Sequence, residues 1–176
     1  MAILMASRTT GGVTEQELER LFQEHYQMLY RTAYSVLDSS ADAEDVAQTI
    51  FVQFLRNGAP RDLLKNPRAY LYRAAVNSSL NILRSRKRQA SRSGELEISL
   101  RAPGGNSEEA THQRLAEAIA ELQPDAAEML LLRYVHDFSD ADIAKLLGRS
   151  RGTIATKLFR TRLRLKKLMR ALGEQR

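Results

Sequence analysis

The sequence predicts an all-α protein of two small helical domains joined by a flexible linker, and three observations support this fold class. Apolar residues recur at spacings of three and four over long stretches, as on the buried face of a helix. No stretch shows the apolar–polar alternation of a strand. The 176 residues include no cysteine, so neither disulfides nor thiolate-bound metal can hold the fold together. Packed helices must therefore supply the core.

The first domain is predicted over residues 15–90, after a disordered tail at 1–14. Apolar residues from Leu18 to Leu37 trace one stripe, which predicts a first long helix. A second helix is expected over residues 42–55. Ser39, followed three residues later by Asp42, is a signal for the start of this helix. Its positions Val46, Ile50 and Phe54 are expected to face the core.

A third helix is predicted to begin at Asn66-Pro67, since asparagine is a good N-cap and proline fits the first helical turn. It leads into the basic run Arg-Ser-Arg-Lys-Arg at residues 84–88. Residues 91–109 contain Pro-Gly-Gly-Asn and no sustained period, as in a linker. Residues 110–176 are predicted to form the second domain.

The last quarter of the chain has the pattern of a helix-turn-helix. Ile143 and Leu147 lie at helical spacing, Gly148 stands where a helix ends, and Ile154 and Leu158 resume the period as buried positions. Short helical hairpins also occur in structural bundles. The second helix is dense in cations, however, and these suit the phosphates beside a major groove. The pattern therefore favours DNA binding.

Charge alternates along the chain in four blocks. Residues 1–60 carry 4 basic and 8 acidic side chains, residues 61–100 carry 9 and 3, residues 101–138 carry 3 and 7, and residues 139–176 carry 11 and 3. Solvated helix surfaces are one explanation. Two acidic blocks are each followed by a basic one. This order favours two modules, each with a basic face for nucleic acid and a second face that points away from the nucleic acid.

No catalytic, metal or cofactor site is predicted. The three histidines are scattered and no nucleophile elbow accompanies them. The carboxylates Asp42, Glu44 and Asp45 lack the spacing of a calcium loop, and no glycine-rich phosphate loop is present. No apolar run is long enough to span a bilayer and no signal peptide is evident. We therefore expect a cytoplasmic protein with no membrane insertion.

Four segments resemble, in order, parts of the conserved regions of bacterial sigma factors. Residues 42–51, DAEDVAQTIF, resemble the family's D-A-E-D-[LV]-x-Q-E-x-F block, and residues 66–77, NPRAYLYRAAVN, resemble its next block, P-x-A-W-L-x-R-I-A-x-N. Residues 130–134, LLLRY, and 152–154, GTI, are similar to its C-terminal domain. Because the chain has room for only two domains, the resemblance is to the smallest class, the extracytoplasmic-function (ECF) sigma factors.

This resemblance implies a non-enzymatic subunit that joins bacterial RNA polymerase and gives it promoter recognition. The N-terminal domain would open the minus-ten element, and the C-terminal domain would read the minus-thirty-five element. The implied partners are core RNA polymerase, through its clamp helices and flap, promoter DNA, and an anti-sigma factor that holds the subunit inactive. No obligate homo-oligomer is expected.

The resemblance also assigns roles to individual residues, and the loop at 57–65 corresponds to the family segment that captures a flipped-out base. The residues implied to bind core polymerase are Asp45, Gln48, Thr49 and Val52. Those implied to bind the minus-ten strand are Arg68, Tyr72, Arg73, Asn77, Asn81, Arg84, Arg86, Lys87 and Arg88. Those implied to bind the minus-thirty-five element are Arg149, Arg151, Ala155, Thr156, Lys157, Phe159, Arg160 and Arg162.

Two positions depart from the family's pattern. Thr49 stands where glutamate is usual, so core affinity is expected to depend more on Asp45 and Gln48. Ala155 stands where a basic residue usually follows G-T-V. A methyl group can touch thymine but cannot donate to guanine, so direct readout there is expected to be weaker or altered. Arg160 is then expected to carry the main polar base contact.

Two other classes of protein stay open at this point. A homodimeric helix-turn-helix regulator acting without polymerase would explain the second domain, but it leaves residues 42–51 and the first basic helix unexplained. A helical adaptor that binds only proteins is disfavoured by the basic block at 139–176. The linker is equally open to two interpretations, a segment that enters the polymerase or an inert spacer.

Overall fold

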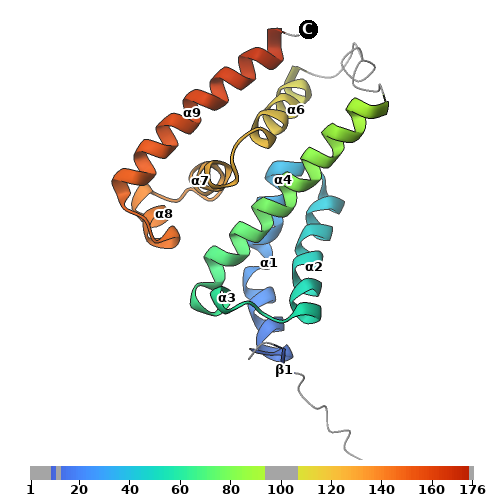
Figure 1. Ribbon diagram of the computed structural model, residues 1–176, viewed down its shortest axis with the longest axis vertical. Coiled ribbons are helices and arrows are strands. Elements are labelled where there is room, and N and C mark those ends of the chain that lie inside the picture. Colours follow the sequence, from blue (N-terminus) through green and yellow to red (C-terminus); the bar gives the residue numbers. More distant parts are fainter. Residues whose placement is uncertain (1–8, 11–12, 94–106, 175–176) are drawn as a thin grey trace, which may run out of the picture.

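The computed structural model describes residues 9–10, 13–93 and 107–174, and most of this chain is helical, which confirms the all-α prediction (Figure 1). Two short strands, β1 (Thr9–Thr10) and β2 (Val13–Thr14), pair antiparallel. The prediction of a disordered tail is therefore wrong for these four residues. Residues 1–8 of that tail, and most of the predicted linker, lie outside the described residues.

Four helices form the N-terminal half: α1 (Glu15–Leu37), α2 (Ser40–Asn57), α3 (Arg61–Lys65) and α4 (Pro67–Ser93). A capping box opens α1, where the Thr14 hydroxyl accepts from the Glu17 backbone N–H and the Glu17 carboxylate accepts from the Thr14 backbone N–H. At the start of α2 the Ser39 hydroxyl accepts from the Asp42 backbone N–H and so caps the helix. The short α3 occupies a segment that the sequence predicts as loop, so that prediction is wrong for its five residues.

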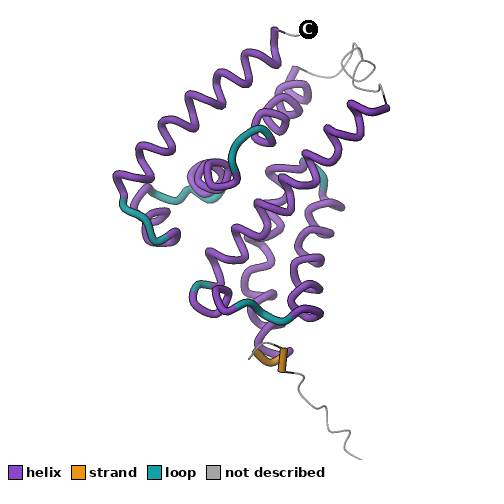
Figure 2. The backbone as a smooth tube through the Cα atoms, viewed as in Figure 1, coloured by secondary structure: helices purple, strands orange, loops and turns teal. Residues whose placement is uncertain are grey.

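Within the described residues 107–174, the C-terminal half is formed by four helices: α6 (Ser107–Ala120), α7 (Pro124–Tyr134), α8 (Asp140–Leu147) and α9 (Arg151–Glu174). Figure 2 shows the tight connection between α8 and α9, which confirms the helix-turn-helix pattern. Because α4 continues to Ser93 and α6 begins at Ser107, both helices extend three residues into the predicted linker.

Gly148 ends α8 in the left-handed region, with φ of 63°. Its replacement by alanine is expected to cost about 1 to 2 kcal/mol of unfolding free energy, because a Cβ disfavours this conformation although the space around it is open. Gly152→Ala is the matched control: it lies in α9, and its added Cβ would meet only Ser150 Oγ at 4.0 Å. Urea unfolding measures the free energy of unfolding of both variants. Equal values for the two would show that the left-handed conformation at Gly148 does not require glycine.

The buried side chains form two clusters that meet at α4. One cluster fills the space between α1, α2 and α4, and it includes Val46, Ile50 and Phe54 as predicted. The other joins α4 to the C-terminal half, where Tyr72 and Leu80 are buried. Figure 1 shows α4 lying between the two halves. The two domains therefore share one of their cores.

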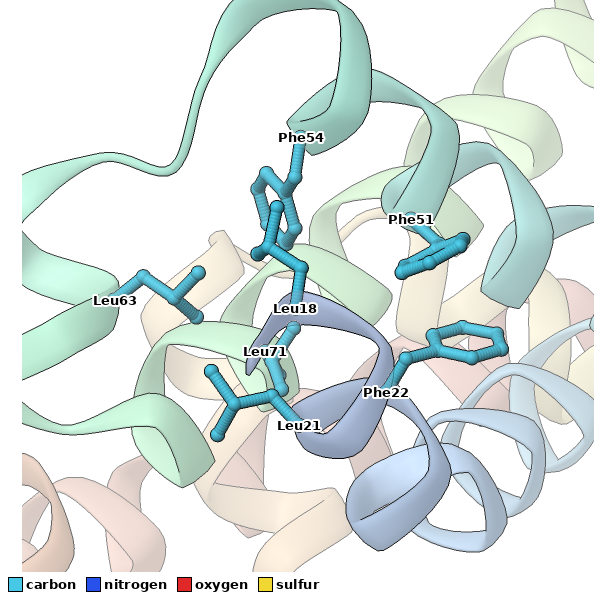
Figure 3. Close-up of a pocket in the computed structure, with 7 residues that line it drawn as sticks. All are labelled: Leu18, Leu21, Phe22, Phe51, Phe54, Leu63 and Leu71. Carbon is cyan, nitrogen blue, oxygen red and sulfur yellow. The ribbon is translucent and has the colours of Figure 1, made fainter. Parts of the chain in front are cut away.

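A small apolar cavity lies inside the N-terminal cluster (Figure 3). Its volume is about 10 Å³, which is close to the minimum for one water molecule. The residues that line it are Leu18, Leu21, Phe22, Phe51, Phe54, Leu63 and Leu71. A space this small and apolar is a packing defect and offers no site for a substrate.

Candidate nucleic-acid interface

The outer face of α2 presents the residues predicted to bind core polymerase. Asp45, Gln48, Thr49 and Val52 are all exposed, whereas the opposite face of the helix is buried. This division follows from the helical period, because the buried positions recur at three and four residues and leave the intervening ones in solvent. The face is therefore available to another protein.

The N-terminal end of α4 is fixed by Asn66, which contacts both halves of the molecule. Its Oδ1 accepts from the Ala69 backbone N–H at 3.1 Å, and its Nδ2 donates to the Leu146 carbonyl at 3.1 Å. Arg68, two residues further, lies over the Phe138 ring with its guanidinium carbon 4.5 Å from the ring centroid. The start of α4 is thus held against the helix-turn-helix.

The middle of α4 contacts α7 through two residues predicted to bind the minus-ten strand. Tyr72 is fully buried, and its hydroxyl donates to the Glu128 carbonyl at 3.2 Å. Arg73 Nε lies 3.3 Å from the carboxylate of Glu128, which is only 4% exposed. Burial raises the pKa of the Glu128 carboxyl, and the charge of Arg73 opposes that shift. This ion pair, in which the carboxylate is buried and the Arg73 side chain is half exposed, therefore joins the two domains.

The basic end of α4 faces the turn between α6 and α7. Arg84 donates to the carbonyls of Ala120 at 3.0 Å and Leu122 at 2.8 Å, and Lys87 Nζ lies 2.6 Å from Glu121 Oε1. A cleft of about 560 Å³ opens here between the domains. The residues that line the cleft are Arg84, Lys87, Arg88, Arg92, Ala120 and Glu121.

The remaining predicted minus-ten residues lie on other parts of the α4 surface. Asn77, Asn81 and Arg88 are exposed. Arg86 is bound within the N-terminal domain, where its Nη2 lies 2.6 Å from Asp42 Oδ1. Arg86 also lowers the pKa of the Asp42 carboxyl by hydrogen bonding, with the Ser39 hydroxyl as a second cause. The predicted residues thus belong to one helix but not to one open surface.

The recognition helix α9 buries Ile154 and Leu158, as predicted, and exposes most of the residues proposed to meet DNA. Arg149 and Lys157 are both bound to Asp125 of α7, at 3.1 and 3.6 Å. These ion pairs hold two cations beside the start of the helix. The exposed predicted residues are Arg149, Arg151, Ala155, Thr156, Phe159, Arg160 and Arg162.

Glu128 and His136 are interface residues that the sequence analysis did not identify. A signal for Glu128 was present, because this carboxylate interrupts an otherwise apolar stretch of α7 between Ala127 and Met129 and must find a partner when buried. His136 carried no such signal. Its Nε2 lies 2.9 Å from Thr32 Oγ1, which already donates to the Met28 carbonyl, so the histidine is the donor of this bond.

His136 makes the contact between domains sensitive to acid. Burial is the main cause, and together with the charges of Arg31 and Arg68, which the charge of Asp137 opposes, it lowers the pKa of His136 from 6.5 to about 4. Because the folded-state pKa is depressed, the neutral ring contributes stability above pH 6.5 that is lost as the pH falls towards 4. The raised pKa of Glu128 has the opposite effect on stability: its contribution decreases as the pH rises.

We expect His136→Gln, which keeps a donor for Thr32, to lose less stability than the wild type between pH 7.5 and 5.5. Urea unfolding at these two pH values measures the difference, and the shared Glu128 contribution cancels between the two proteins. An identical pH dependence in both would show that His136 does not carry the effect.

The described residues contain no group of three or more acidic, histidine or cysteine side chains that could hold a metal ion. Within the same ranges, no helix is long and apolar enough to cross a membrane. The surfaces that stand out are the two basic helices and the outer face of α2. They define a class of protein, a two-domain helical protein with a helix-turn-helix and a second basic helix.

Comparisons with known proteins agree with this class. The family model described as Sigma-70 region 2 matches residues 21–89, and the model described as Sigma-70, region 4 matches residues 112–165. The chain is 26% identical over 168 residues to the ECF RNA polymerase sigma factor SigM of Mycobacterium tuberculosis, covering 96% of this chain and 84% of that protein. It is 27% identical over 179 residues to SigL of the same organism, covering 98% and 100%.

A solved structure of the sigma factor RpoE with the anti-sigma factor NepR from Bartonella quintana also matches. Its TM-score is 0.47 at 22% identity, and the match covers 89% of this chain and 96% of that one. The two matched regions and the relatives named above show that the chain belongs to the ECF sigma factors of the sigma-70 family. The family consists of non-catalytic initiation factors, and this sigma factor directs transcription initiation by RNA polymerase.

Proposed function

We propose that the two domains divide promoter recognition between them. The N-terminal domain binds core polymerase through α2 and the opened minus-ten strand through α4, and the C-terminal domain reads the minus-thirty-five element through α9. The observation that carries this proposal is the presence of a separate cationic helix in each domain, α4 and α9, beside the exposed polar face of α2. Two cationic helices suit two separated segments of DNA.

The outer face of α2 is the proposed contact with the polymerase clamp helices. Asp45 supplies a charge, Gln48 and Thr49 supply hydrogen-bonding groups, and Val52 supplies an exposed apolar group. A surface with apolar and polar groups side by side fits the composition of a protein interface. The flap of polymerase is proposed as the partner of the C-terminal domain on the family resemblance alone.

Unstacking a base costs a few kcal/mol, so the minus-ten strand must gain contacts on α4 that repay it. The exposed Asn77, Asn81 and Arg88 are proposed to bind this strand, together with Arg68, Tyr72 and Arg73 once the domains separate. Arg84, Arg86 and Lys87 are proposed to hold phosphates, which orient the strand without reading its sequence.

In the major groove, Ala155, Thr156, Phe159 and Arg160 are proposed to face base edges. Phe159 leaves 57% of its surface in solvent, and a large exposed aromatic group is suited to contact with thymine methyl groups. Arg149, Arg151, Lys157 and Arg162 are proposed to hold the flanking phosphates. We propose further that the protein has no catalytic activity of its own, and that it acts in the cytoplasm, where polymerase meets the chromosome.

Arg160→Ala is expected to cost about 1 to 3 kcal/mol for DNA with the preferred base at one position, and much less for DNA changed there. Binding of the full chain with core polymerase to a panel of single-base variants measures this difference. Arg164→Ala, which removes the same charge from an exposed position of α9 with no assigned DNA contact, is the control. An equal loss on every sequence would assign Arg160 to the phosphates instead.

Mapping transcript start sites after overexpression tests the proposed function as a whole. We expect new start sites that share two sequence elements at a fixed separation. Occupied DNA sites without new start sites would instead support a regulator that acts without joining polymerase.

A further inference from the structure

We propose that α9 reads the C5 methyl groups of pyrimidine bases through an exposed apolar ridge of Ala155, Phe159 and Leu163. Thymine carries this methyl group on its major-groove edge. The base 5-methylcytosine carries it at the same ring atom, whereas cytosine and uracil lack it. This inference rests on the proposed role of α9 in reading the minus-thirty-five element, and it gives a role to Leu163.

The ridge follows one row of side chains along α9, because its members are spaced four residues apart. All three are exposed, and Phe159 leaves 57% of its surface in solvent and Leu163 leaves 55%. Ile154 and Leu158 bury the opposite face of the helix, so the ridge points away from the core. Figure 1 shows α9 along the outer edge of the molecule. Contiguous exposed apolar side chains indicate an interaction site more strongly than scattered single ones do.

Exposed cations surround the ridge at both ends and on both sides. Tyr134 holds one of them in place, because its hydroxyl oxygen accepts from Arg162 Nη1 at 3.4 Å. The centre of a protein interface is usually depleted of charge, whereas DNA requires cations for its phosphates. An apolar ridge with this surround therefore fits DNA better than it fits a protein partner. The surrounding cations are Arg151, Arg160, Arg162, Lys166 and Lys167.

The dimensions of α9 match the ridge to the floor of a major groove. A helix with its side chains is about 10 to 12 Å wide, and the major groove is about 12 Å wide. When α9 fills the groove, the ridge faces the base edges, and Arg162 and Lys166, one row away, face the phosphates along one side. The helix rises about 12 Å from Ala155 to Leu163, which corresponds to about three to four base pairs.

The C5 methyl is the apolar group that base edges offer in the major groove. Apolar side chains gain free energy when they bury it, whereas a basic side chain at the same place would select guanine. Ala155 stands where the family pattern has a basic residue, so the ridge begins with a methyl group in place of a cation. Methylation of cytosine at C5 within the element should consequently raise the affinity of the sigma factor for that promoter.

The test uses the full chain with core polymerase and duplex promoter DNA whose start site has been mapped. Each position of the minus-thirty-five element, on each strand, is prepared with thymine or deoxyuridine opposite adenine, and with 5-methylcytosine or cytosine opposite guanine. Each pair of duplexes then differs by one methyl group. The proteins compared with the wild type are Phe159→Ala and Leu163→Ala, at exposed positions where truncation should leave the fold intact, and Lys166→Ala, a control that removes a cation beside the ridge.

We expect the methyl group to raise the affinity of the wild type about three- to five-fold at the positions that Phe159 and Leu163 contact, within about four base pairs of each other. The thymine series and the 5-methylcytosine series should show the same preference at the same positions. Phe159→Ala and Leu163→Ala should each lose the preference at one position and keep it at the other. Lys166→Ala should weaken binding to both members of every pair equally.

Equal affinity of the wild type for both members of every pair would overturn the proposal, as would an unchanged methyl preference in both alanine variants. Leu163→Ala with unaltered affinity for every duplex would also contradict it, because the ridge would then serve a partner other than DNA. Failure of the proposed function gives a different result. The wild type with core polymerase would then bind equally well to promoter DNA whose whole minus-thirty-five element had been replaced, and the inference would fail with it.

Discussion

Reversing the charge of Asp45 to arginine is expected to reduce promoter-specific transcription to the level of core polymerase alone. Asp45 is exposed on α2, and its helix is held by Val46, Ile50 and Phe54 on the opposite face, so the substitution should leave the fold intact. A like charge at a protein interface costs several kcal/mol, which corresponds to a loss of affinity of about 100-fold or more. Binding of fluorescently labelled sigma factor to core polymerase measures this loss directly.

Thr49→Glu is the matched variant on the same face, and it restores the residue usual in the family. We expect it to bind core polymerase more tightly than the wild type, while circular dichroism and thermal unfolding stay unchanged in both proteins. If Asp45→Arg retained wild-type affinity, the outer face of α2 would not be the polymerase contact.

The second large effect is expected from Leu80→Ala, which removes a fully buried side chain from the cluster shared by the two domains. Truncation of a buried leucine costs about 2 to 5 kcal/mol of unfolding free energy. Because the cluster joins α4 to α7, we expect the wild type to unfold in one cooperative transition and the variant to shift that whole transition to lower urea.

Helical circular dichroism and a fluorescent label at Lys167→Cys would follow the unfolding of the whole chain and of α9 separately. Leu115→Ala, at a partly exposed position of α6, is a control with the same chemical change. A wild type that unfolds in two separate transitions, with α9 unaffected by Leu80→Ala, would contradict a shared core.

The local structure was predictable where strong chemical signals act over a few residues. Ser39 and Asn66 mark helix starts, and Gly148 marks a helix end, because each satisfies a backbone requirement that few other residues meet. The buried faces of α2 and α9 followed from helical spacing alone. The short strands at Thr9–Thr10 and Val13–Thr14 were missed, since two-residue segments carry no usable period.

The packing of one domain on the other was not predictable from these signals. Arginine and tyrosine on a helix can meet DNA or another part of the same chain, and the sequence patterns are the same in both cases. The partners of Tyr72 and Arg84 are backbone carbonyls, which every residue possesses, so no side-chain pattern identifies them. Only Glu128, a carboxylate within an apolar stretch, gave a chemical indication of a buried contact.

Run-off transcription with purified core RNA polymerase and the full chain tests the central claim most directly. The template would carry a promoter found by mapping start sites, and matched templates would be altered in either the minus-ten or the minus-thirty-five element. The account predicts a transcript of defined start that requires the chain and is lost when either element is changed. Tight binding of the free chain to duplex DNA, with no transcript from core polymerase, would contradict it.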